Sequence, residues 1–535
     1  MTMKVDAITL AVFNHRLSSI AEEMGVTLCR SAFSANIKER RDFSCALFDA
    51  AGEMVAQAAH IPVHLGSTPL SVRAAIAQMP LRPGDVVVLN DPYAGGTHLP
   101  DVTVVAPVFL PGARPPGARP PGARHAPFGY VANRAHHADI GGSAPGSMAL
   151  ATEIYQEGLR LPPVRLMARG RIVDDVLRLF LANTRVTEER RGDLLAQVAA
   201  LRVGALRMRE LASRAGQPAT VAAMAALQAY SARCMSAVLR HVPRGVYRAE
   251  DWMDDDGAGS VRIPIRVAIH VGAGRALVDF TGTAPQVSGG INANYAVTLA
   301  AVLYTFQLLG DTDIPANAGL LQPLRVVAPL GTLVNAAAPA AVAGGNVETS
   351  QRIVDVLLKA LAKALPGRIP AASQGSMNNL ALGGHDPFRQ RSFAYYETIA
   401  GGAGAGPVGP GASGVQTHMT NTLNTPIEAL EAAYPVRVTR YSLRPGSGGR
   451  GTHRGGDGIV REIEALAPMQ ATVLSERRRL RPYGLRGGGN GRAGQNNWIR
   501  AGKTQRLAGK TTRTLAAADR LCIMTPGGGG WGRRR

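Results

Sequence analysis

The spacing of hydrophobic residues predicts helices in the first two thirds of the chain. One apolar stripe, with members three or four residues apart, predicts a helix over residues 6–24. The stripe consists of Phe13, Leu17, Ile20 and Met24. Apolar spacing and Ala/Leu-rich composition predict further helices over residues 71–78, 172–240, 295–309 and 350–364.

Alternating and short apolar runs predict strands between these helices. The first pair is a hairpin over residues 43–59 with its turn at residues 49–52. Beyond about residue 400, glycine and short apolar pairs dominate, which favours strands and turns. The other predicted strands are residues 86–89, 102–105, 130–132 and 259–283.

Together these elements predict an α+β, multi-domain fold with mixed and antiparallel sheets, helical segments and a β-rich C-terminal part. A length of 535 residues corresponds to several domains. Shifts in composition place the edges near residues 240 and 400. The predicted domains are 1–240, carrying the candidate site and a helical extension, 241–400, an α/β middle region, and 401–535, a Gly/Arg-rich β region.

Composition restricts the class of protein. Hydrophobic residues make up 46% of the chain, enough for sizeable cores. No run of about 18 uncharged apolar residues is present, and charged residues interrupt any export signal at the N-terminus. The four cysteines form no CxxC pair, which disfavours a zinc ribbon or iron–sulfur cluster. We therefore expect a soluble, cytoplasmic protein without a membrane anchor.

The net charge of +21 is concentrated near the C-terminus. Residues 450–535 hold 16 Arg and two Lys against five acidic residues, with the densest run at 477–481. Such a run can bind nucleic acid, contact an acidic partner or be a solvated surface. Only Tyr483, Trp498 and Trp531 supply aromatic rings there, so we disfavour nucleic-acid binding.

The strongest chemical signal is a group of histidine and aspartate residues around the strands at 102–105 and 130–132. Imidazole and carboxylate together suit Zn, Mn or Fe(II). If the two strands pair antiparallel around the Pro-Gly-Ala-Arg repeat at residues 111–124, Asp101 lies opposite His136. The group consists of His98, Asp101, His136, His137 and Asp139.

Other ligands and other interpretations remain open from the residues alone. The histidine pair could be only a polar loop, whereas two histidines and two aspartates meeting across a hairpin favour a metal site. Asp42, at the mouth of the first hairpin, is a candidate further ligand, and His60 and His64 are its rivals.

Motifs for nucleotide binding and serine hydrolysis fail on inspection. The Gly-Lys-Thr triplets at 502–504 and 509–511 lack the upstream glycine of a Walker A motif. The GxGxxG pattern at 404–409 contains a proline and is not followed by a helical pattern. No G-x-S-x-G elbow is present.

Several longer motifs, in order along nearly the whole chain, resemble the hydantoinase B/oxoprolinase family. Members are B-type subunits of ATP-dependent cyclic-amide hydrolases, and acetone and acetophenone carboxylase subunits are more distant relatives. The matching stretches are Arg-Asp-Phe-Ser-Cys at 41–45, Leu-Asn-Asp-Pro-Tyr-Ala-Gly-Gly-Thr-His-Leu-Pro-Asp at 89–101, Asn-Arg-Ala-His-His-Ala-Asp-Ile-Gly-Gly at 133–142, Gly-Gly-Asn-Val-Glu-Thr-Ser-Gln at 344–351, Gly-Ser-Met-Asn-Asn at 375–379, His-Met-Thr-Asn-Thr-Leu-Asn-Thr-Pro at 418–426 and Thr-Pro-Gly-Gly-Gly-Gly-Trp-Gly at 525–532.

The resemblance implies a site and a reaction. Its metal ligands are carried over to Asp42, His98, Asp101 and His136, which favours Asp42 over His60. His137 and Asp139 would orient the ligands or relay protons. The metal would be Zn or Mn, with Fe as a third candidate.

The resemblance also implies partners. ATP would be bound by a hydantoinase A-type subunit in a hetero-oligomer, and the substrate would be a small cyclic amide such as a hydantoin, 5-oxoproline or a lactam. The competing expectations are an acetone-carboxylase-like subunit and a basic nucleic-acid-binding protein.

Overall fold

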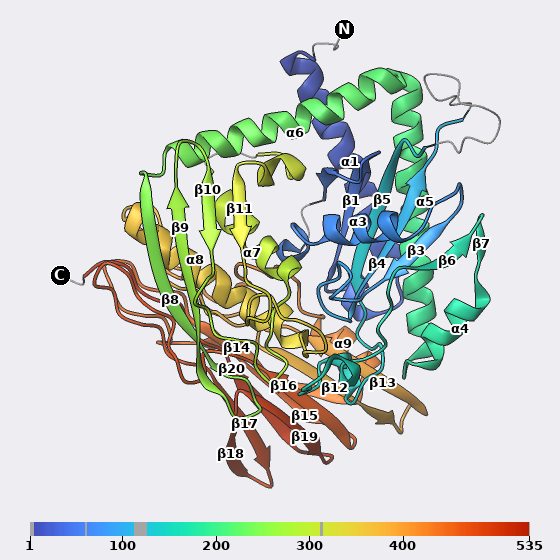
Figure 1. Cartoon of the computed structure of the whole chain (residues 1–535). Helices are drawn as coiled ribbons and strands as arrows, with labels where there is room; N and C mark the ends of the chain where they lie inside the picture. Colours follow the sequence, from blue (N-terminus) through green and yellow to red (C-terminus); the bar gives the residue numbers. More distant parts are fainter. Residues whose placement is uncertain (1–4, 59–60, 112–125, 311–313, 534–535) are drawn as a thin grey trace.

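A computed structural model describes residues 5–58, 61–111, 126–310 and 314–533. His60, most of the Pro-Gly-Ala-Arg repeat and the last two arginines lie outside these residues. Four sheets and the helices around them form an α+β fold, as predicted (Figure 1). The helices are α1 (Ala7–Ser31), α2 (Ala35–Lys38), α3 (Thr68–Gln78), α4 (Asp174–Ala182), α5 (Thr187–Ala215), α6 (Gln217–Arg240), α7 (Tyr295–Gln307), α8 (Ser350–Ala364) and α9 (Ile427–Ala433).

A seven-stranded sheet organises the N-terminal part, in the order β2-β1-β5-β4-β3-β6-β7. One face packs through residues such as Val104 and Val131 onto α1 and α5, and the other through Val105 onto α3. The alternation of side chains along each strand thus buries both faces. The strands are β1 (Phe43–Asp49), β2 (Met54–Gln57), β3 (Val86–Leu89), β4 (Asp101–Val108), β5 (Gly129–His136), β6 (Val164–Ala168) and β7 (Arg171–Ile172).

The middle of the chain forms a four-stranded sheet in the order β11-β10-β9-β8. Its apolar face, which includes Ile265 and Ile269, shares one core with α7 and α8. The alternation around 259–283 predicted β9 and β10, whereas the acid-rich strand β8 was not predicted. The strands are β8 (Gly245–Asp255), β9 (Val261–Val271), β10 (Ala276–Asp279) and β11 (Leu324–Val327).

The C-terminal part is rich in strands, as predicted, and forms two further sheets. Their orders are β13-β12-β16-β19 and β14-β15-β20-β17-β18. They share a core that includes Phe393, Ile463 and Leu521. The strands are β12 (Asn379–Asp386), β13 (Arg391–Glu397), β14 (Val436–Arg444), β15 (Gly458–Ala465), β16 (Met469–Leu474), β17 (Gln495–Arg500), β18 (Lys503–Leu507), β19 (Lys510–Leu515) and β20 (Arg520–Met524).

Two of the four arginines in the basic run at 477–481 are interior: Arg477 and Arg478 are buried, whereas Arg479 and Arg481 are exposed. Arg477 is 1% exposed, and its Nη2 lies 2.7 Å from both Asp251 and Asp355. Arg478 is also buried and donates to Asn378 and Asn496. The interpretation of this run as a solvated surface is therefore wrong for these two arginines, because acids far away in sequence pair with Arg477.

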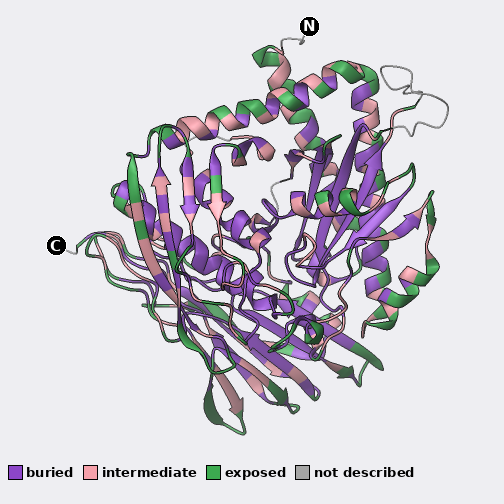
Figure 2. Ribbon diagram, viewed as in Figure 1, coloured by how far each residue is buried: buried purple, intermediate pink, exposed green. Residues whose placement is uncertain are grey.

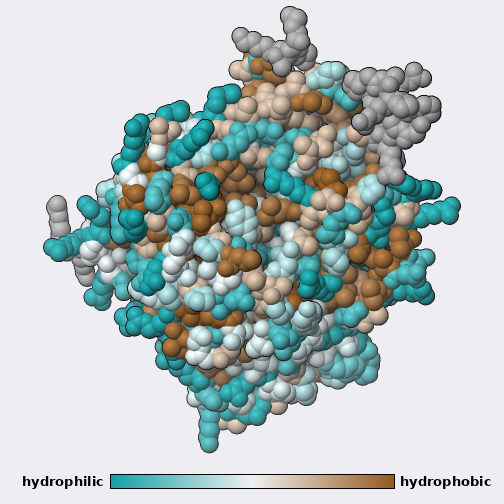
Figure 3. All heavy atoms as spheres, viewed as in Figure 1, coloured by the Kyte–Doolittle hydropathy of each residue, from teal (hydrophilic) through white to brown (hydrophobic). Residues whose placement is uncertain are grey.

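The outer surface mixes polar and apolar side chains. Most strands of the seven-stranded sheet are buried, and exposed residues gather on the outer faces of the helices and at strand ends (Figure 2). On the face in view, hydrophobic residues form small groups among hydrophilic ones (Figure 3). Among the described residues, no helix combines the length and apolar character needed to cross a membrane.

Candidate metal centre

The open end of the β4–β5 hairpin brings two predicted ligands together. Asp101 is the first residue of β4, His136 is the last residue of β5, and the two are paired in register. The pairing continues without a bulge to Val108 and Gly129. The predicted register is thus confirmed, and it places the 111–124 repeat in the connection at the opposite end.

His98 reaches the same point from the loop that precedes β4. The side chain of Asn294, which caps α7, donates to the carbonyls of Pro92, Gly96 and Thr97. A Cβ atom at Gly96 would lie 2.5 Å from the Asn90 carbonyl oxygen, so this close turn requires glycine. The loop therefore presents His98 in a fixed position.

The three side chains form one compact, buried set of donor atoms. One ligand atom from each of His98, Asp101 and His136 lies within 4.8 Å of the others. His98 Nε2 is 3.1 Å and His136 Nδ1 is 3.3 Å from Asp101 Oδ1. The three residues are at most 3% exposed, so water competes little with the carboxylate for the histidines.

The charge states of the set suit a metal. Burial alone would raise the pKa of Asp101, but His98, His64 and the hydrogen bond with His136 together hold it well below its usual range. Burial lowers the pKa of His136, against the opposing effect of Asp101 and Asp42. Both directions favour the ionised carboxylate and the neutral imidazole, which are the forms that bind metal ions.

The histidine nitrogens also lack other partners. Among the described residues, neither ring nitrogen of His98 accepts or donates a hydrogen bond, and His136 Nε2 makes none. Buried polar atoms are normally satisfied, so unpaired nitrogens beside a carboxylate fit an ion that would complete them. Two imidazoles and one carboxylate are the donor types that Zn, Mn and Fe(II) accept.

The rival ligands lie around this set. His64 Nε2 is 3.4 Å from Asp101 Oδ2, and its Nδ1 is 3.0 Å from the Ser44 hydroxyl. The Asp42 carbonyl oxygen accepts the His136 backbone N–H at 3.0 Å, while the carboxylate stays outside the compact set and lies 3.9 Å from Arg40. His60 lies outside the described residues.

His137 and Asp139 point to other neighbours. His137 Nε2 is 3.0 Å from Gln197 Oε1, and burial lowers the pKa of this histidine to about 4. The Asp139 carboxylate accepts two hydrogen bonds from Arg185, one from the guanidinium at 2.7 Å and one from the backbone N–H at 2.6 Å. The structure does not bring either residue into the compact donor set.

A tyrosine from a distant part of the chain covers the set. The Tyr396 ring, on β13, stacks on the His136 ring with centroids 4.6 Å apart and planes at 16°. Arg40 donates to the Tyr396 carbonyl oxygen at 2.9 Å and lies over the ring. The sequence carries no local signal for this contact, because Tyr396 follows His136 by 260 residues. The set therefore lies where the N-terminal sheet meets the β12–β13 hairpin.

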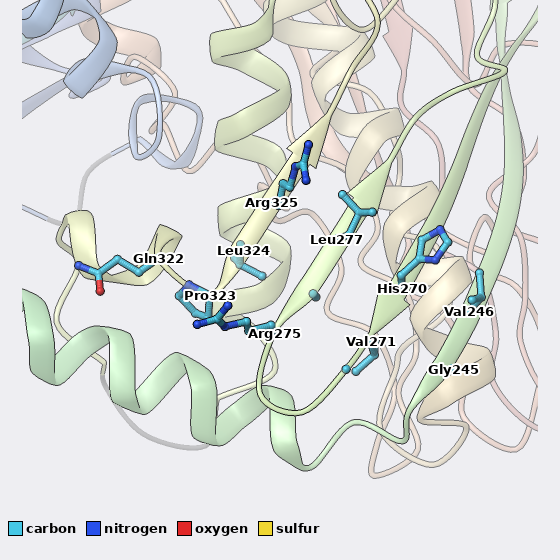
Figure 4. Close-up of a pocket in the computed structure, with 12 residues that line it drawn as sticks. Gly245, Val246, His270, Val271, Arg275, Leu277, Gln322, Pro323, Leu324 and Arg325 are labelled. Atoms are coloured by element: carbon cyan, nitrogen blue, oxygen red, sulfur yellow. The ribbon is translucent and has the colours of Figure 1, made fainter.

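A surface groove lies away from the donor set. This groove of about 610 Å³ lies at one end of the four-stranded sheet, where β8, β10 and β11 begin and β9 ends, with His270, Arg275 and Arg325 among its lining side chains (Figure 4). It contains none of the predicted ligands. The chemical signal and the surface shape therefore point to different places, and the buried donor set is the candidate site.

Known proteins resemble this chain over its whole length. The family model described as hydantoinase B/oxoprolinase matches residues 6–534. The chain is 42% identical to 5-oxoprolinase 1 of Arabidopsis thaliana, over 98% of this chain but 42% of the longer plant protein. It is 32% identical to the B-type subunit of a putative D-/L-hydantoinase from a Pseudomonas species, over 99% of this chain and 90% of that protein.

Two solved structures share the fold. The ATP-dependent caprolactamase from Pseudomonas jessenii superimposes with a TM-score of 0.91 at 31% identity, over 99% of this chain and 92% of that one. A nucleotide-free acetone carboxylase superimposes with a TM-score of 0.88 at 18% identity, over 99% of this chain and 76% of that one. At this identity the second likeness concerns the fold alone.

Proposed function

The chain belongs to the hydantoinase B/oxoprolinase family, and on that premise we propose that it is the metal-bearing part of an ATP-dependent cyclic-amide hydrolase. In this proposal, the substrate is activated by an ATP-using partner and opened at the site formed by His98, Asp101 and His136. The observation that carries the proposal is the buried three-donor set, in which both nitrogens of His98 and Nε2 of His136 have no hydrogen-bond partner among the described residues.

Each nearby residue then has a role. His98, Asp101 and His136 would hold the ion. Thr97 donates to Asp101 Oδ2 at 2.6 Å and, with His64 close to the same oxygen, leaves Oδ1 toward the two histidines. Orienting contacts of this kind fix the ligands of metal sites. A divalent ion held by these residues would supply Lewis acidity, which would favour deprotonation of water and polarisation of a carbonyl group.

Asp42 remains the proposed fourth ligand. The family resemblance supports it, and the negative charge of Asp42 acts on the neighbouring His136. Its backbone is also tied to His136 by a hydrogen bond. An Asp42 oxygen would be the fourth protein ligand, and the ion would then need a fifth position for water or substrate, which zinc can provide by expanding its coordination.

For His137 and Asp139 we propose a positioning role. Gln197 contacts His137 and also donates to Asn133 on β5 and to the Val102 carbonyl oxygen on β4. Asp139 fixes the segment after β5 through Arg185. Both contacts hold the end of the hairpin from which His136 projects, so the two residues would act on the metal ligand through the backbone.

The need for ATP follows from the bond to be broken. An unstrained cyclic amide is stabilised by resonance, and coupling its opening to ATP supplies the missing driving force. We propose that a hydantoinase A-type partner binds ATP and activates the amide. Two relatives support a partner: one is named as a B-type subunit of a hydantoinase, and in the plant 5-oxoprolinase the matched part is joined to a further 58% of one longer chain.

The carboxylase alternative has less support, because the acetone carboxylase likeness is one of fold. A product carrying a new carboxyl group, formed only with bicarbonate, would identify that activity. We expect none.

The test combines the purified chain with an A-type partner, ATP and a panel of 5-oxoproline, hydantoin and caprolactam. We expect ATP-dependent ring opening by the mixture and no ATP turnover by the chain alone. His98→Ala and His136→Ala should abolish both bound metal and ring opening, while His241→Ala, a change at an exposed helix end, should leave them unchanged. Full activity without bound metal would refute the proposal.

A further inference from the structure

Glu348 is a buried acid that the proposed reaction leaves without a role. It lies in the π-helical turn Gly345–Thr349 that runs into α8, and it is fully buried. Its Oε1 accepts hydrogen bonds from the Met377 backbone N–H at 3.0 Å and from Asn379 Nδ2 at 2.7 Å. Its Oε2 makes no hydrogen bond among the described residues. π-Helical turns of this kind often mark functional positions.

A continuous chain of contacts leads from Glu348 to the donor set. Asn379 Oδ1 accepts the hydroxyl hydrogen bond of Tyr396 at 2.7 Å, and the Tyr396 ring stacks on His136. The two N–H groups of the Asn379 amide go to Glu348 Oε1 and to the Leu474 carbonyl oxygen at 2.8 Å. With both donors engaged, the amide oxygen has to face Tyr396.

We propose that Glu348 is a positioning residue of the metal centre, which fixes the Asn379 amide so that Tyr396 holds the His136 ring in the plane that binds the ion. This inference rests on the proposed function for its metal, and on the contacts above for its geometry. Each link is a direct contact between buried side chains. Because these side chains have little room to rearrange independently, a change at Glu348 should alter the position of the His136 ring.

The surroundings of Glu348 make this arrangement sensitive to pH. Burial and the nearby Glu476 raise the pKa of Glu348 to about 8, against the opposing effect of Ser376, Lys510 and Arg478. At pH 7 the residue is therefore a neutral carboxylic acid, and its proton fits on Oε2, since Oε1 accepts two donors.

Ionisation would place a second negative charge beside Glu476. That glutamate already holds Lys510 at 2.7 Å and Arg352 at 3.2 Å. Arg478 donates to Asn378, the neighbour of Asn379, at 2.8 Å. A charged Glu348 would attract Lys510 and Arg478 away from these partners, so alkaline pH should disturb the start of β12 and, through Tyr396, the ion.

The chain offers closely matched variants. Glu348→Gln keeps the shape and the acceptor for Asn379 but cannot ionise, and Glu348→Ala removes the contact. Glu157→Gln is the control, because Glu157 is also buried, has its pKa raised to about 8 by burial, and accepts two N–H bonds, from Val342 and Ala343. These contacts lie outside the chain of residues that ends at His136.

The experiment measures Zn²⁺ affinity of each full-length variant by competition with a chromophoric chelator between pH 6.5 and 9.5. Each affinity is divided by the wild-type affinity at the same pH, so the effects of zinc hydrolysis and of histidine protonation, which are common to all variants, cancel. We expect Glu348→Gln to match the wild type at pH 6.5 and to bind about tenfold more tightly at pH 9.5, while Glu157→Gln stays within twofold throughout. Glu348→Ala should lose about 10–100-fold at every pH.

Two results would overturn the inference: a Glu348→Gln variant that weakens with pH in parallel with the wild type, or a folded Glu348→Ala variant with wild-type affinity. If Glu348→Ala does not fold, the Glu348→Gln profile alone decides. A wild-type protein that binds zinc but opens no cyclic amide with its partner would refute the proposed activity. It would not affect the test of Glu348, which depends on zinc affinity alone.

Discussion

Replacing Asp101 by asparagine perturbs the donor set at its centre. Asp101 Oδ1 lies within 3.3 Å of both ligand histidines, and Oδ2 accepts the Thr97 hydroxyl at 2.6 Å with His64 beside it. Asparagine has nearly the same shape but offers one oxygen, and the Thr97 hydrogen bond favours keeping that oxygen on the Oδ2 side. The amide NH₂ would then face the histidines, where it cannot bind a cation.

The size of the effect follows from the role of the carboxylate. Groups that only orient metal ligands change affinity by about 10–100-fold when removed. Asp101 supplies a ligand atom and the one formal negative charge of the compact set, so the loss should exceed that range. We expect metal affinity to fall by at least about 100-fold, or about 2.7 kcal/mol at roughly 1.4 kcal/mol per tenfold.

The assay is chelator competition on the purified full chain, with Asp139→Asn as the matched control. Asp139 is also buried and also binds a side-chain donor, Arg185, but it stays outside the donor set. Asparagine at position 139 keeps one acceptor oxygen for Arg185, so the control should lose only about tenfold, the lower bound for a change to an orienting group. Equal losses in the two variants, or wild-type affinity in Asp101→Asn, would refute the assignment of the ligands.

Three further predictions concern the rest of the molecule. Arg477→Met should lower the free energy of unfolding by about 3–5 kcal/mol, because it removes the closest cationic partner of the buried Asp251 and Asp355 and leaves Asp251 only the more distant Arg352 at 3.6 Å, whereas the exposed Arg479→Met should change it little in the same denaturant titration. Deleting residues 115–124 halves the 20-residue connection 109–128 between Val108 and Gly129; stability should rise by about 0.6 kcal/mol with metal content unchanged, and lost metal would contradict the hairpin argument. Glu157 has a folded-state pKa of about 8, above its ordinary 4.5. Its contribution to stability is complete below pH 4.5 and is lost as pH rises through 8, so Glu157→Gln should flatten the decline of the unfolding free energy between pH 6 and 9.

The hairpin that positions Asp101 and His136 could be predicted from local sequence. The register of an antiparallel pair depends on where its connection is centred, and the repeat at 111–124 marks that centre. Strand β4 pairs with β5 as this reasoning predicts, and the side chains of Asp101 and His136 meet. The helices α1, α3, α7 and α8 were predicted for a similar reason, because the signal is periodic within each segment.

Contacts chosen by tertiary packing could not be predicted in this way. Tyr396 contacts His136, and Glu348 is linked to Tyr396 through Asn379. Both lie more than 200 residues beyond His136, and neither belongs to a motif that identifies its partner. The pairing of Arg477 with Asp251 and Asp355 has the same origin. A basic run in sequence therefore does not reveal whether its charges face water or buried acids.

Asp42 and His64 show a third limit. Both lie beside the donor set, as the first hairpin suggested, yet the sequence could not rank them. In the structure His64 is near Asp101, and Asp42 is bonded to His136 through its backbone. The family resemblance favours Asp42, whereas the compact donor set contains neither residue.

The most direct test of the central claim is a crystal structure of the zinc-loaded protein with anomalous scattering recorded on both sides of the zinc absorption edge. The account predicts one strong peak in contact with His98, Asp101 and His136, with Zn–N and Zn–O distances of about 2.0–2.2 Å. A peak bound by other residues, with these three side chains remaining uncoordinated, would contradict it.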